Sequence, residues 1–195
     1  GNRLYLDADV VISESLIEQI QEVFETQNQP VFVSGTVEPR YGKSYVSKAY
    51  SQIWAASPYI RNSVPGCGCY GVNQKGRELW GEFETVYADD KFVRLLFSRN
   101  LRVQVSAKYF WPLPKGCISL VKSRIRWSSG NRQLIDKYPE LSINESNRVD
   151  FEFIKILIKM PFQASVFCAI YLFAAIVVYI KPIPKTEDIK WFRSR

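Results

Sequence analysis

Two aspartates that follow a short apolar strand could bind a hard cation. Asp7 and Asp9 form an Asp-Ala-Asp sequence directly after residues 2–6, which have the pattern of a strand. Ligand sites form beyond the carboxyl ends of parallel strands, and alternating strand geometry predicts that both carboxylates point to one side. They could then converge on Mn²⁺ or Mg²⁺, and such a cation would neutralise a diphosphate. The alternative interpretation is a solvated turn before the next helix.

A second pair of acids stands at the start of a predicted helix. Asp89 and Asp90 open a helix expected over residues 89–99. The sequence contains no histidine, so a carboxylate is the natural candidate for a general base that takes a proton from an attacking hydroxyl. The alternative is that both acids only interact favourably with the positive end of the helix dipole.

A third group combines arginine with tryptophan on a basic helix. Arg124, Arg126 and Trp127 lie in the sequence Val-Lys-Ser-Arg-Ile-Arg-Trp. An arginine beside an indole can bind a phosphate and stack on a ring. Positions two apart on a helix diverge by about 200°, so we expect only one of the two arginines to face the site. The alternative is a basic helix on a membrane, with Trp127 as an interfacial anchor.

Composition limits the class of protein. The chain has 195 residues, 47% of them hydrophobic, which is enough for one domain with a real core and excludes a disordered or collagenous chain. The absence of histidine excludes a histidine-based triad or metal cage. Four cysteines with uneven spacing fit neither a disulfide scaffold nor a zinc site.

Charge is distributed unevenly along the chain. Residues 1–90 carry 7 Lys/Arg and 12 Asp/Glu, a net charge of −5, whereas residues 91–195 carry 19 and 7, a net charge of +12. Nucleic acid could bind such a basic half. The basic half also holds the longest apolar run of the chain, however, and that combination favours a membrane surface with anionic head groups. We therefore expect a membrane as a partner and no nucleic acid.

The apolar run extends from Phe162 to Ile180 without a charged residue. A helix of this length, at about 1.5 Å per residue, just covers a hydrocarbon core of roughly 30 Å. We expect a transmembrane or membrane-inserted helix at residues 161–181, after a basic amphipathic connector at residues 146–160 and before a basic tail at residues 182–195. A buried core helix and a shallow insertion kinked at Pro161 are the alternatives.

Strand and helix patterns alternate through the first 137 residues. We expect strands at residues 2–6, 30–37, 67–72 and 101–107, and helices at 13–28, 43–57, 89–99 and, after a proline-led loop from residue 112, up to about 137. This order predicts an α/β fold with a mostly parallel sheet and flanking helices.

The order and spacing of three motifs resemble those of the processive-type family 2 glycosyltransferases, inverting enzymes with the GT-A fold. The motifs read LYLDAD, YADDKFV and SRIRW, and the glycine-rich GCGCYGVN, with Gly66 and Gly68, looks like the acceptor-side strand of that family. The resemblance covers residues 2–135. It implies a partial GT-A (Rossmann-like) domain at residues 1–145 that uses a nucleotide-sugar donor and a sugar or lipid-linked acceptor.

The resemblance also implies roles for the motif residues. Asp7 and Asp9 would bind a divalent cation, Mn²⁺ or Mg²⁺, and the diphosphate of the donor. Asp90 matches the catalytic aspartate, with Asp89, in the place of a glutamate, as the second choice. Arg126 and Trp127 match the Arg-Trp pair, with Arg124 beside them, and would bind diphosphate or acceptor together with Gly66 and Gly68. Ser123 replaces the usual glutamine, which favours transfer of a single sugar over processive polymerisation.

Two further expectations follow from the resemblance. The family strands that bind the nucleotide base precede Asp-x-Asp and have no counterpart in these 195 residues, so we expect the isolated chain to be inactive. Because sugar nucleotides are cytosolic, we expect the domain on the cytoplasmic face of a membrane. Two rival classes use the same residues, namely a metal-dependent phosphate-ester hydrolase or phosphotransferase and a non-catalytic membrane-associated protein.

Overall fold

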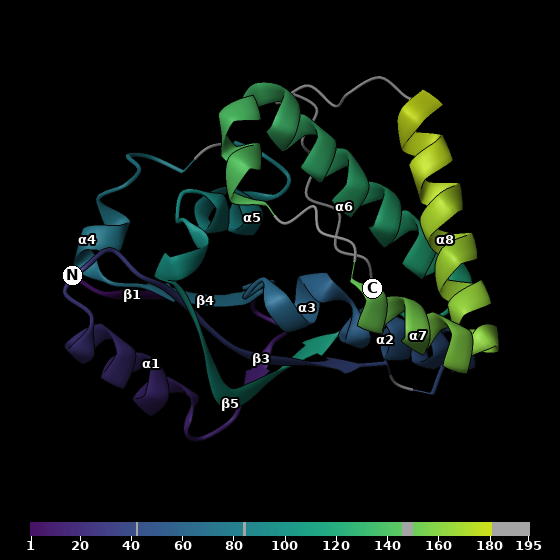
Figure 1. The fold of residues 1–195 in the computed structure, drawn as a ribbon, viewed down its shortest axis with the longest axis horizontal. Coiled ribbons are helices and arrows are strands. Elements are labelled where there is room, and N and C mark those ends of the chain that lie inside the picture. The colour runs from purple at the N-terminus through teal and green to yellow at the C-terminus, as the bar shows by residue number, and fades with distance from the viewer. Residues whose placement is uncertain (42, 84, 146–149, 181–195) are drawn as a thin grey trace.

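The computed structural model describes residues 1–41, 43–83, 85–145 and 150–180. Five strands form one sheet (Figure 1): β1 (Arg3–Leu6), β2 (Val11–Ile12), β3 (Phe32–Arg40), β4 (Cys69–Val72) and β5 (Arg102–Pro112). The helices are α1 (Leu16–Thr26), α2 (Tyr45–Ala56), α3 (Pro58–Asn62), α4 (Gln74–Arg77), α5 (Asp89–Leu95), α6 (Cys117–Lys137), α7 (Phe151–Lys159) and α8 (Pro161–Ile180), with 3₁₀ turns η1 (Arg99–Leu101) and η2 (Pro139–Asn144). The expected α/β class is confirmed.

The expectation of a mostly parallel sheet is wrong. The strand order is β1-β4-β3-β5-β2, and β3–β5 is the parallel pair, while β1–β4, β3–β4 and β2–β5 are antiparallel. In general, a single helix between two strands brings the chain back to the end of the sheet at which the first strand began, so the two strands run parallel. Two helices, α2 and α3, separate β3 from β4, and the chain enters β4 from the opposite end.

The link between β1 and β2 is very short for the distance it must cover. These strands form opposite edges of the sheet, and only residues 7–10 connect them. Four gaps of about 4.8 Å in a flat sheet would separate the edges by about 19 Å. Five chain steps of about 3.4 Å reach roughly 17 Å when fully extended, and residues 8 and 9 are in a turn. The sheet is therefore curled, and its two edges approach each other at this link.

Helices cover the curled sheet on both faces. Figure 1 shows α1 below the sheet, α5 and α6 above it, and α8 beside α6. Leu16 and Ile20 of α1 are buried, in the spacing expected for the inward face of a helix. The hydroxyl of Ser44 accepts a hydrogen bond from the Ser47 N–H at 3.2 Å and so begins α2. Ser13, expected to begin the first helix, instead accepts a bond from the Lys108 N–H of β5 at 3.2 Å.

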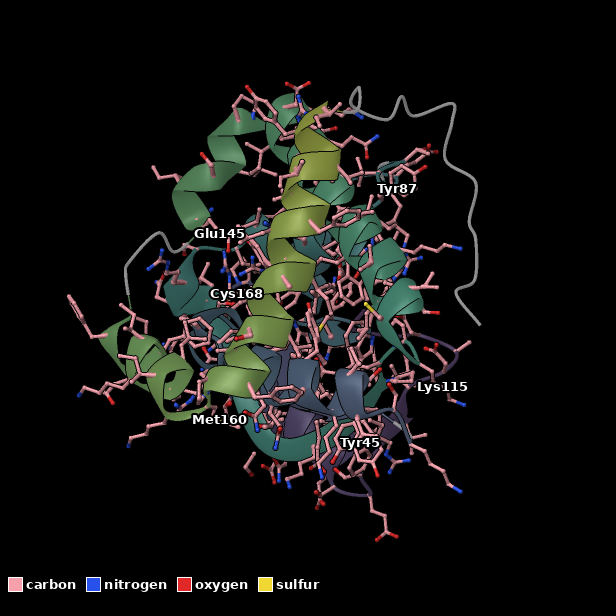
Figure 2. The ribbon with its side chains drawn as sticks, turned by 90° about the vertical axis from the view of Figure 1, so that its right-hand side faces the viewer. Tyr45, Tyr87, Lys115, Glu145, Met160 and Cys168 are labelled. Atoms are coloured by element: carbon pink, nitrogen blue, oxygen red, sulfur yellow. The ribbon has the colours of Figure 1, made fainter. Side chains whose placement is uncertain are left out.

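The C-terminal helix α8 packs lengthwise against α6 (Figures 1 and 2). Among the described residues it is the helix that is long and apolar enough to cross a membrane. The Arg124 guanidinium of α6 lies 4.1 Å from the centre of the Tyr171 ring, and Arg132 donates a hydrogen bond to the Val178 carbonyl at 2.6 Å. One face of α8 is therefore held by the domain, and most of its remaining side chains are exposed.

The predicted connector and tail lie partly outside the described residues. Within the predicted 146–160 connector, residues 150–159 include the helix α7, whose first turn is capped by the Asp150 carboxylate. This carboxylate accepts bonds from the N–H groups of Glu152 and Phe153 at 2.9 and 3.1 Å. Residues 146–149 and the predicted basic tail at 182–195 lie outside the description.

A buried ion pair fixes the helix that carries the second acid pair. Arg94 of α5 is fully buried, and its guanidinium donates to both carboxylate oxygens of Glu145 at 2.8 and 3.1 Å. Lys91 lies 3.3 Å from the same carboxylate. Burial would raise the pKa of Glu145, but the charges of Arg94 and Lys91 hold it below its ordinary value. A single carboxylate thus neutralises two cations of α5.

Removing the charge of Glu145 should destabilise the protein strongly. Glu145→Gln leaves Arg94 buried without a counter-charge, a situation that typically costs about 3–5 kcal/mol in free energy of unfolding. Glu38→Gln is the matched control, because Glu38 forms an exposed ion pair with Lys108 at 2.9 Å, and such pairs contribute only about 0–1 kcal/mol. Chemical denaturation measures both. Equal losses in the two variants would contradict the structural role of Glu145.

Candidate active site

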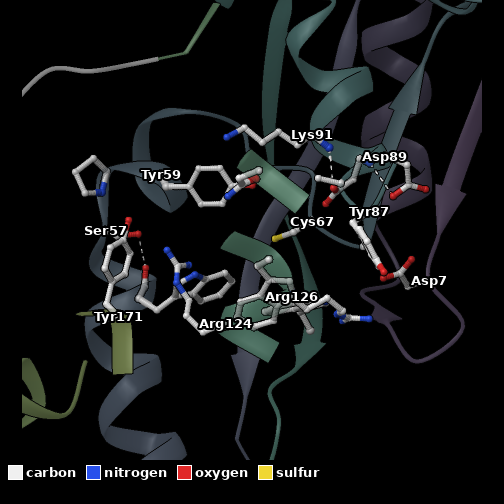
Figure 3. A pocket seen from close by; sticks show the side chains of 18 of the residues that line it. Asp7, Ser57, Tyr59, Cys67, Tyr87, Asp89, Lys91, Arg124, Arg126 and Tyr171 are labelled. Atoms are coloured by element: carbon white, nitrogen blue, oxygen red, sulfur yellow. Dashed lines mark hydrogen bonds between the residues drawn. The ribbon is translucent and has the colours of Figure 1, made fainter. Parts of the chain in front are cut away.

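A cavity of about 980 Å³ lies between the sheet, α5, α6 and the C-terminal helices. All three motifs predicted to do chemistry contribute to its wall: Asp7 from the end of β1, Asp89 and Asp90 from the start of α5, and Arg126 with Trp127 from α6. Segments more than a hundred residues apart in the sequence therefore meet at one site (Figure 3).

Asp7 reaches the cavity from a turn. The strand ends at Leu6, the Asp7 N–H donates to the Gly68 carbonyl at 2.9 Å, and the Val10 N–H donates to the Asp7 carbonyl at 3.1 Å. The predicted alternating geometry of Asp7 and Asp9 is therefore wrong. Asp7 and Asp9 are both exposed, but only Asp7 lines the cavity, so the two carboxylates have different surroundings.

Gly68 makes room for Asp7. Its φ is +73°, and a Cβ at this position would lie 3.0 Å from Asp7 Oδ2 and 3.0 Å from Trp111. The predicted site residue Gly66 has a different role: it does not line the cavity, and a Cβ there would lie 2.5 Å from Phe32 Cζ. Gly66 thus allows close packing of the core beneath the site.

Asp90 is the carboxyl with the most perturbed pKa in the cavity. Burial and then the charge of Asp89 raise its pKa to about 6, while a hydrogen bond from the Lys91 N–H at 2.7 Å opposes the rise. Burial also raises the pKa of Asp89, whose Oδ1 accepts a bond from the Asp90 N–H at 2.9 Å. The charge of a neighbouring carboxylate therefore adds to burial at Asp90, and Asp90 holds its proton at a higher pH than an ordinary aspartate.

Asp7 belongs to the same electrostatic cluster. Burial, Asp9 and then Asp89 raise its pKa, and the charge of Arg126 lowers it. Figure 3 shows Arg126 extending toward Asp7 and Tyr87. The cluster therefore carries more negative than positive charge at this end of the cavity.

Close packing against α6 sets the position of the acid pair. A Cβ at Gly130 would lie 2.8 Å from the Tyr87 Cβ, so the glycine lets α6 approach the segment before Asp89. The Gln133 side chain accepts a hydrogen bond from the Tyr87 N–H at 3.1 Å. These contacts hold the segment before α5, and with it the acid pair, against α6.

Both arginines of the third motif line the cavity. The expectation that only one of them would face the site is wrong, because both of these long side chains reach the cavity wall. Arg126 lies near the acids, whereas Arg124 lies over the Tyr171 ring at 4.1 Å. Trp127 belongs to a row of three indoles: its ring is tilted against that of Trp111, with 5.3 Å between the ring centres, and Trp111 stacks on Trp54 at 5.1 Å.

Several lining residues were not predicted from the sequence. Trp54, Tyr59, Cys67 and Trp111 complete the wall. Burial raises the pKa of the Cys67 thiol to about 12, so this thiol is protonated and unreactive at neutral pH. Of these four residues, only Cys67 lies in a motif that the sequence singled out, the glycine-rich GCGCYGVN. The other three reach the wall through long-range packing, which leaves no local pattern in the sequence.

The acidic end suits a hard divalent cation only in part. Within the described part of the chain, no group of three or more Cys, Asp or Glu side chains is arranged to hold a metal ion. Asp7 supplies an oxygen ligand of the type that Mg²⁺ and Mn²⁺ prefer, and the net negative charge around it favours a cation. A cation bound by Asp7 would complete its coordination with water or with oxygens of a bound substrate.

Comparison of the sequence with protein-family models gives no match, and no curated protein matches it significantly.

The raised pKa of Asp90 should appear in the pH dependence of stability. A carboxyl with a folded-state pKa near 6, above its ordinary 3.8, binds its proton more tightly in the folded protein. The stability it contributes is complete below about pH 4 and is lost as the pH rises through 6, by up to about 3 kcal/mol. In EDTA, the free energy of unfolding should therefore fall between pH 4 and 6, and the fall should be clearly smaller in Asp90→Asn. An identical pH profile in the variant would show that Asp90 titrates normally.

Proposed function

We propose that this chain forms the catalytic and acceptor side of an inverting glycosyltransferase that uses a nucleotide-sugar donor. The observation that carries the proposal is the meeting of Asp7, Asp90 and the Arg126–Trp127 pair around one large cavity. These positions are the ones that the resemblance to family 2 glycosyltransferases assigns to cation and diphosphate binding, to base catalysis and to the Arg-Trp motif.

Asp90 is the proposed general base. A base works best when its pKa lies close to the pH of the reaction, and the pKa of about 6 for Asp90 is much closer to neutrality than that of an exposed aspartate. The carboxylate is fixed by the Lys91 N–H and by the buried anchor Arg94 one turn further along α5. It thus remains in place while an acceptor binds.

The proposed reaction is a single displacement. An acceptor hydroxyl gives its proton to Asp90 as its oxygen attacks the anomeric carbon from the face opposite the leaving group. The new carbon–oxygen bond forms as the bond from the anomeric carbon to the diphosphate oxygen breaks, and the nucleoside diphosphate leaves with that electron pair. The configuration at the anomeric carbon is inverted.

Asp7 and Arg126 are the groups proposed to handle the diphosphate. A bound Mn²⁺ or Mg²⁺ would supply Lewis-acid stabilisation of the leaving group's charge. Asp7 is the protein ligand proposed for it, and the exposed Asp9 strengthens the negative potential around Asp7. Arg126 balances part of this acidic cluster and can donate hydrogen bonds to phosphate oxygens.

The acceptor side favours addition of one sugar. In the position of the family's glutamine, Ser123 is buried within the packing of α6 and is not one of the residues lining the cavity. It offers no side chain to a growing polymer, which supports a non-processive transferase of cell-envelope or extracellular polysaccharide or glycolipid synthesis.

Membrane association is proposed through α7 and α8. Exposed apolar side chains cover the outer face of both helices, among them Phe151, Ile158, Phe173 and Ile176, while Lys155 and Lys159 stand beside them in α7. Lysines at the edge of an apolar surface suit anionic head groups. Because nucleotide sugars are made in the cytosol, the proposed orientation places the cavity on the cytoplasmic face.

Replacing Asp90 tests the role of the base. In the intact protein, Asp90→Asn should reduce turnover about 10²–10⁴-fold, the usual contribution of a general base, with little change in donor binding. The matched variant Asp89→Asn should lose distinctly less, because its main effect is to lower the pKa of Asp90. Transfer of radiolabelled sugar measures both variants. A dead Asp89→Asn with an active Asp90→Asn would move the role to Asp89.

Replacing the first acid pair tests cation use. In the intact protein, Asp7→Asn should abolish most Mn²⁺- or Mg²⁺-dependent transfer, whereas Asp9→Asn should retain more activity because its carboxylate lies outside the cavity. Cation titrations of the transfer rate separate the two. Activity insensitive to EDTA would refute the cation assignment, and release of phosphate without any acceptor would identify a hydrolase.

A further inference from the structure

The cavity is longer than the acidic site requires. Away from Asp7 and Asp90 it continues between α6 and the C-terminal helices, where Phe153 and Leu157 of α7 and Phe167 of α8 form its wall. The Phe153 and Phe167 rings meet edge to face at 6.4 Å between ring centres. One continuous cavity thus has an acidic end and an apolar end.

The apolar end reaches the outer surface of α8. Leu172 and Tyr171 both line the cavity, yet they are 61% and 44% exposed. They lie on the same helix as the exposed Phe173 and Ile176. The cavity therefore opens at the apolar surface proposed to face the membrane, and a hydrocarbon chain could pass from one to the other without crossing water.

A cation stands between the two ends. Figure 3 shows Arg124 between Tyr171 and Arg126. Its Nε lies buried with no hydrogen-bond partner, and within the described ranges no carboxylate forms an ion pair with it. Arg124 as a whole is half-buried, and a guanidinium N–H without a partner can donate a strong hydrogen bond to an anionic phosphate oxygen. Arg124 thus offers a site for an anion at the point where the apolar wall gives way to the polar one.

We infer that the acceptor is a lipid-linked sugar whose hydrocarbon chain lies between α7 and α8, whose phosphate binds Arg124 and whose hydroxyl reaches Asp90. This inference rests on the proposed glycosyl transfer and specifies its acceptor. The order along one cavity is an apolar wall, then Arg124 with no ion pair among the described residues, then the half-buried Asp90, and it matches the order of chain, phosphate and sugar in such a molecule.

Binding of farnesyl phosphate tests the inference without any transfer reaction. The intact protein is placed in phosphatidylcholine nanodiscs, and binding is followed by tryptophan fluorescence, because Trp54, Trp111 and Trp127 line the cavity. Farnesyl phosphate should bind saturably and at least tenfold more tightly than either inorganic phosphate or farnesol, since each of these lacks one of the two contacts.

Two matched variants locate the chain. Leu172 and Ile176 are aliphatic residues of α8 with 61% and 58% exposure, but only Leu172 lines the cavity. Leu172→Gln should weaken binding of farnesyl phosphate about fivefold or more, and Ile176→Gln should leave it within twofold. Arg124→Gln should weaken farnesyl phosphate at least tenfold and farnesol hardly at all. Equal effects of Leu172→Gln and Ile176→Gln would place the chain on the outer surface and overturn the inference.

Two further measurements distinguish an ordinary phospholipid from the proposed acceptor, and this inference from the proposed function. If phosphatidylglycerol added to the nanodiscs abolishes binding of farnesyl phosphate, the site holds an ordinary anionic phospholipid and the acceptor assignment is wrong. Asp90→Asn should bind farnesyl phosphate like the unmodified protein. Normal binding without any sugar transfer would refute the proposed function alone, whereas transfer to soluble sugars without binding of farnesyl phosphate would refute this inference alone.

Discussion

The four residues that join β1 to β2 impose the constraint on which the site depends. They connect opposite edges of a five-stranded sheet, and a flat sheet would hold these edges further apart than the link can reach. The end of β1 pairs directly with β4, Leu6 opposite Cys69, and the Asp7 N–H continues this ladder by donating a hydrogen bond to the carbonyl of Gly68, just before β4. Because Gly68 has no side chain, the Asp7 carboxylate lies close to Trp111 and faces the cavity. The four residues that force the sheet to curl thus also include the first acid of the cavity.

Charge in the cavity is left unbalanced at two separate places. At one end, burial and then neighbouring carboxylates, Asp89 among them, raise the pKa of Asp7 and Asp90, while the charge of Arg126 lowers that of Asp7 and the charge of Arg94 lowers that of Asp90. Some distance away, Arg124 lies without a carboxylate partner among the described residues. The structural charges Arg94 and Lys91, by contrast, are both compensated by Glu145. Compensated charges support the fold, and uncompensated charges line the space where a ligand would bind.

Local patterns predicted most elements but not their arrangement. The spacing of Leu16 and Ile20 and the apolar run of β3 depend on near neighbours, so the corresponding helix and strand were expected close to where they are found. The direction of β4 depends on the path through α2 and α3, which carries no local signature, and the mostly parallel sheet was therefore a wrong expectation. The turn at Asp7–Asp9 was also missed, because it depends on which strands lie at the edges of the sheet and not on the residues next to it.

The candidate site was predictable where a motif carries its own chemistry. Asp7, Asp89, Asp90, Arg126 and Trp127 line the cavity as the motifs suggested. Trp54, Trp111 and the anchoring Glu145 were not expected, since a single tryptophan or glutamate gives no sign of a partner 50 residues away or more. The expectation that only one of Arg124 and Arg126 would face the site was wrong, because helix geometry gives the angle between two side chains, whereas the surrounding fold decides which long side chains reach a cavity.

Through the contact at Gly130, α6 connects α8 rigidly to the segment before α5. This helix of 21 residues is about 30 Å long, touches α8 at Tyr171 and Val178, and presses at Gly130 against the Tyr87 backbone without room for one more methyl group. Helices are stiff along their axes, and packed interiors compress very little. A tilt of α8 against the domain would therefore move α6 and, through Gly130, the start of α5. If α8 lies in a membrane as proposed, its tilt there would thereby shift the start of α5 and the two aspartates that it carries.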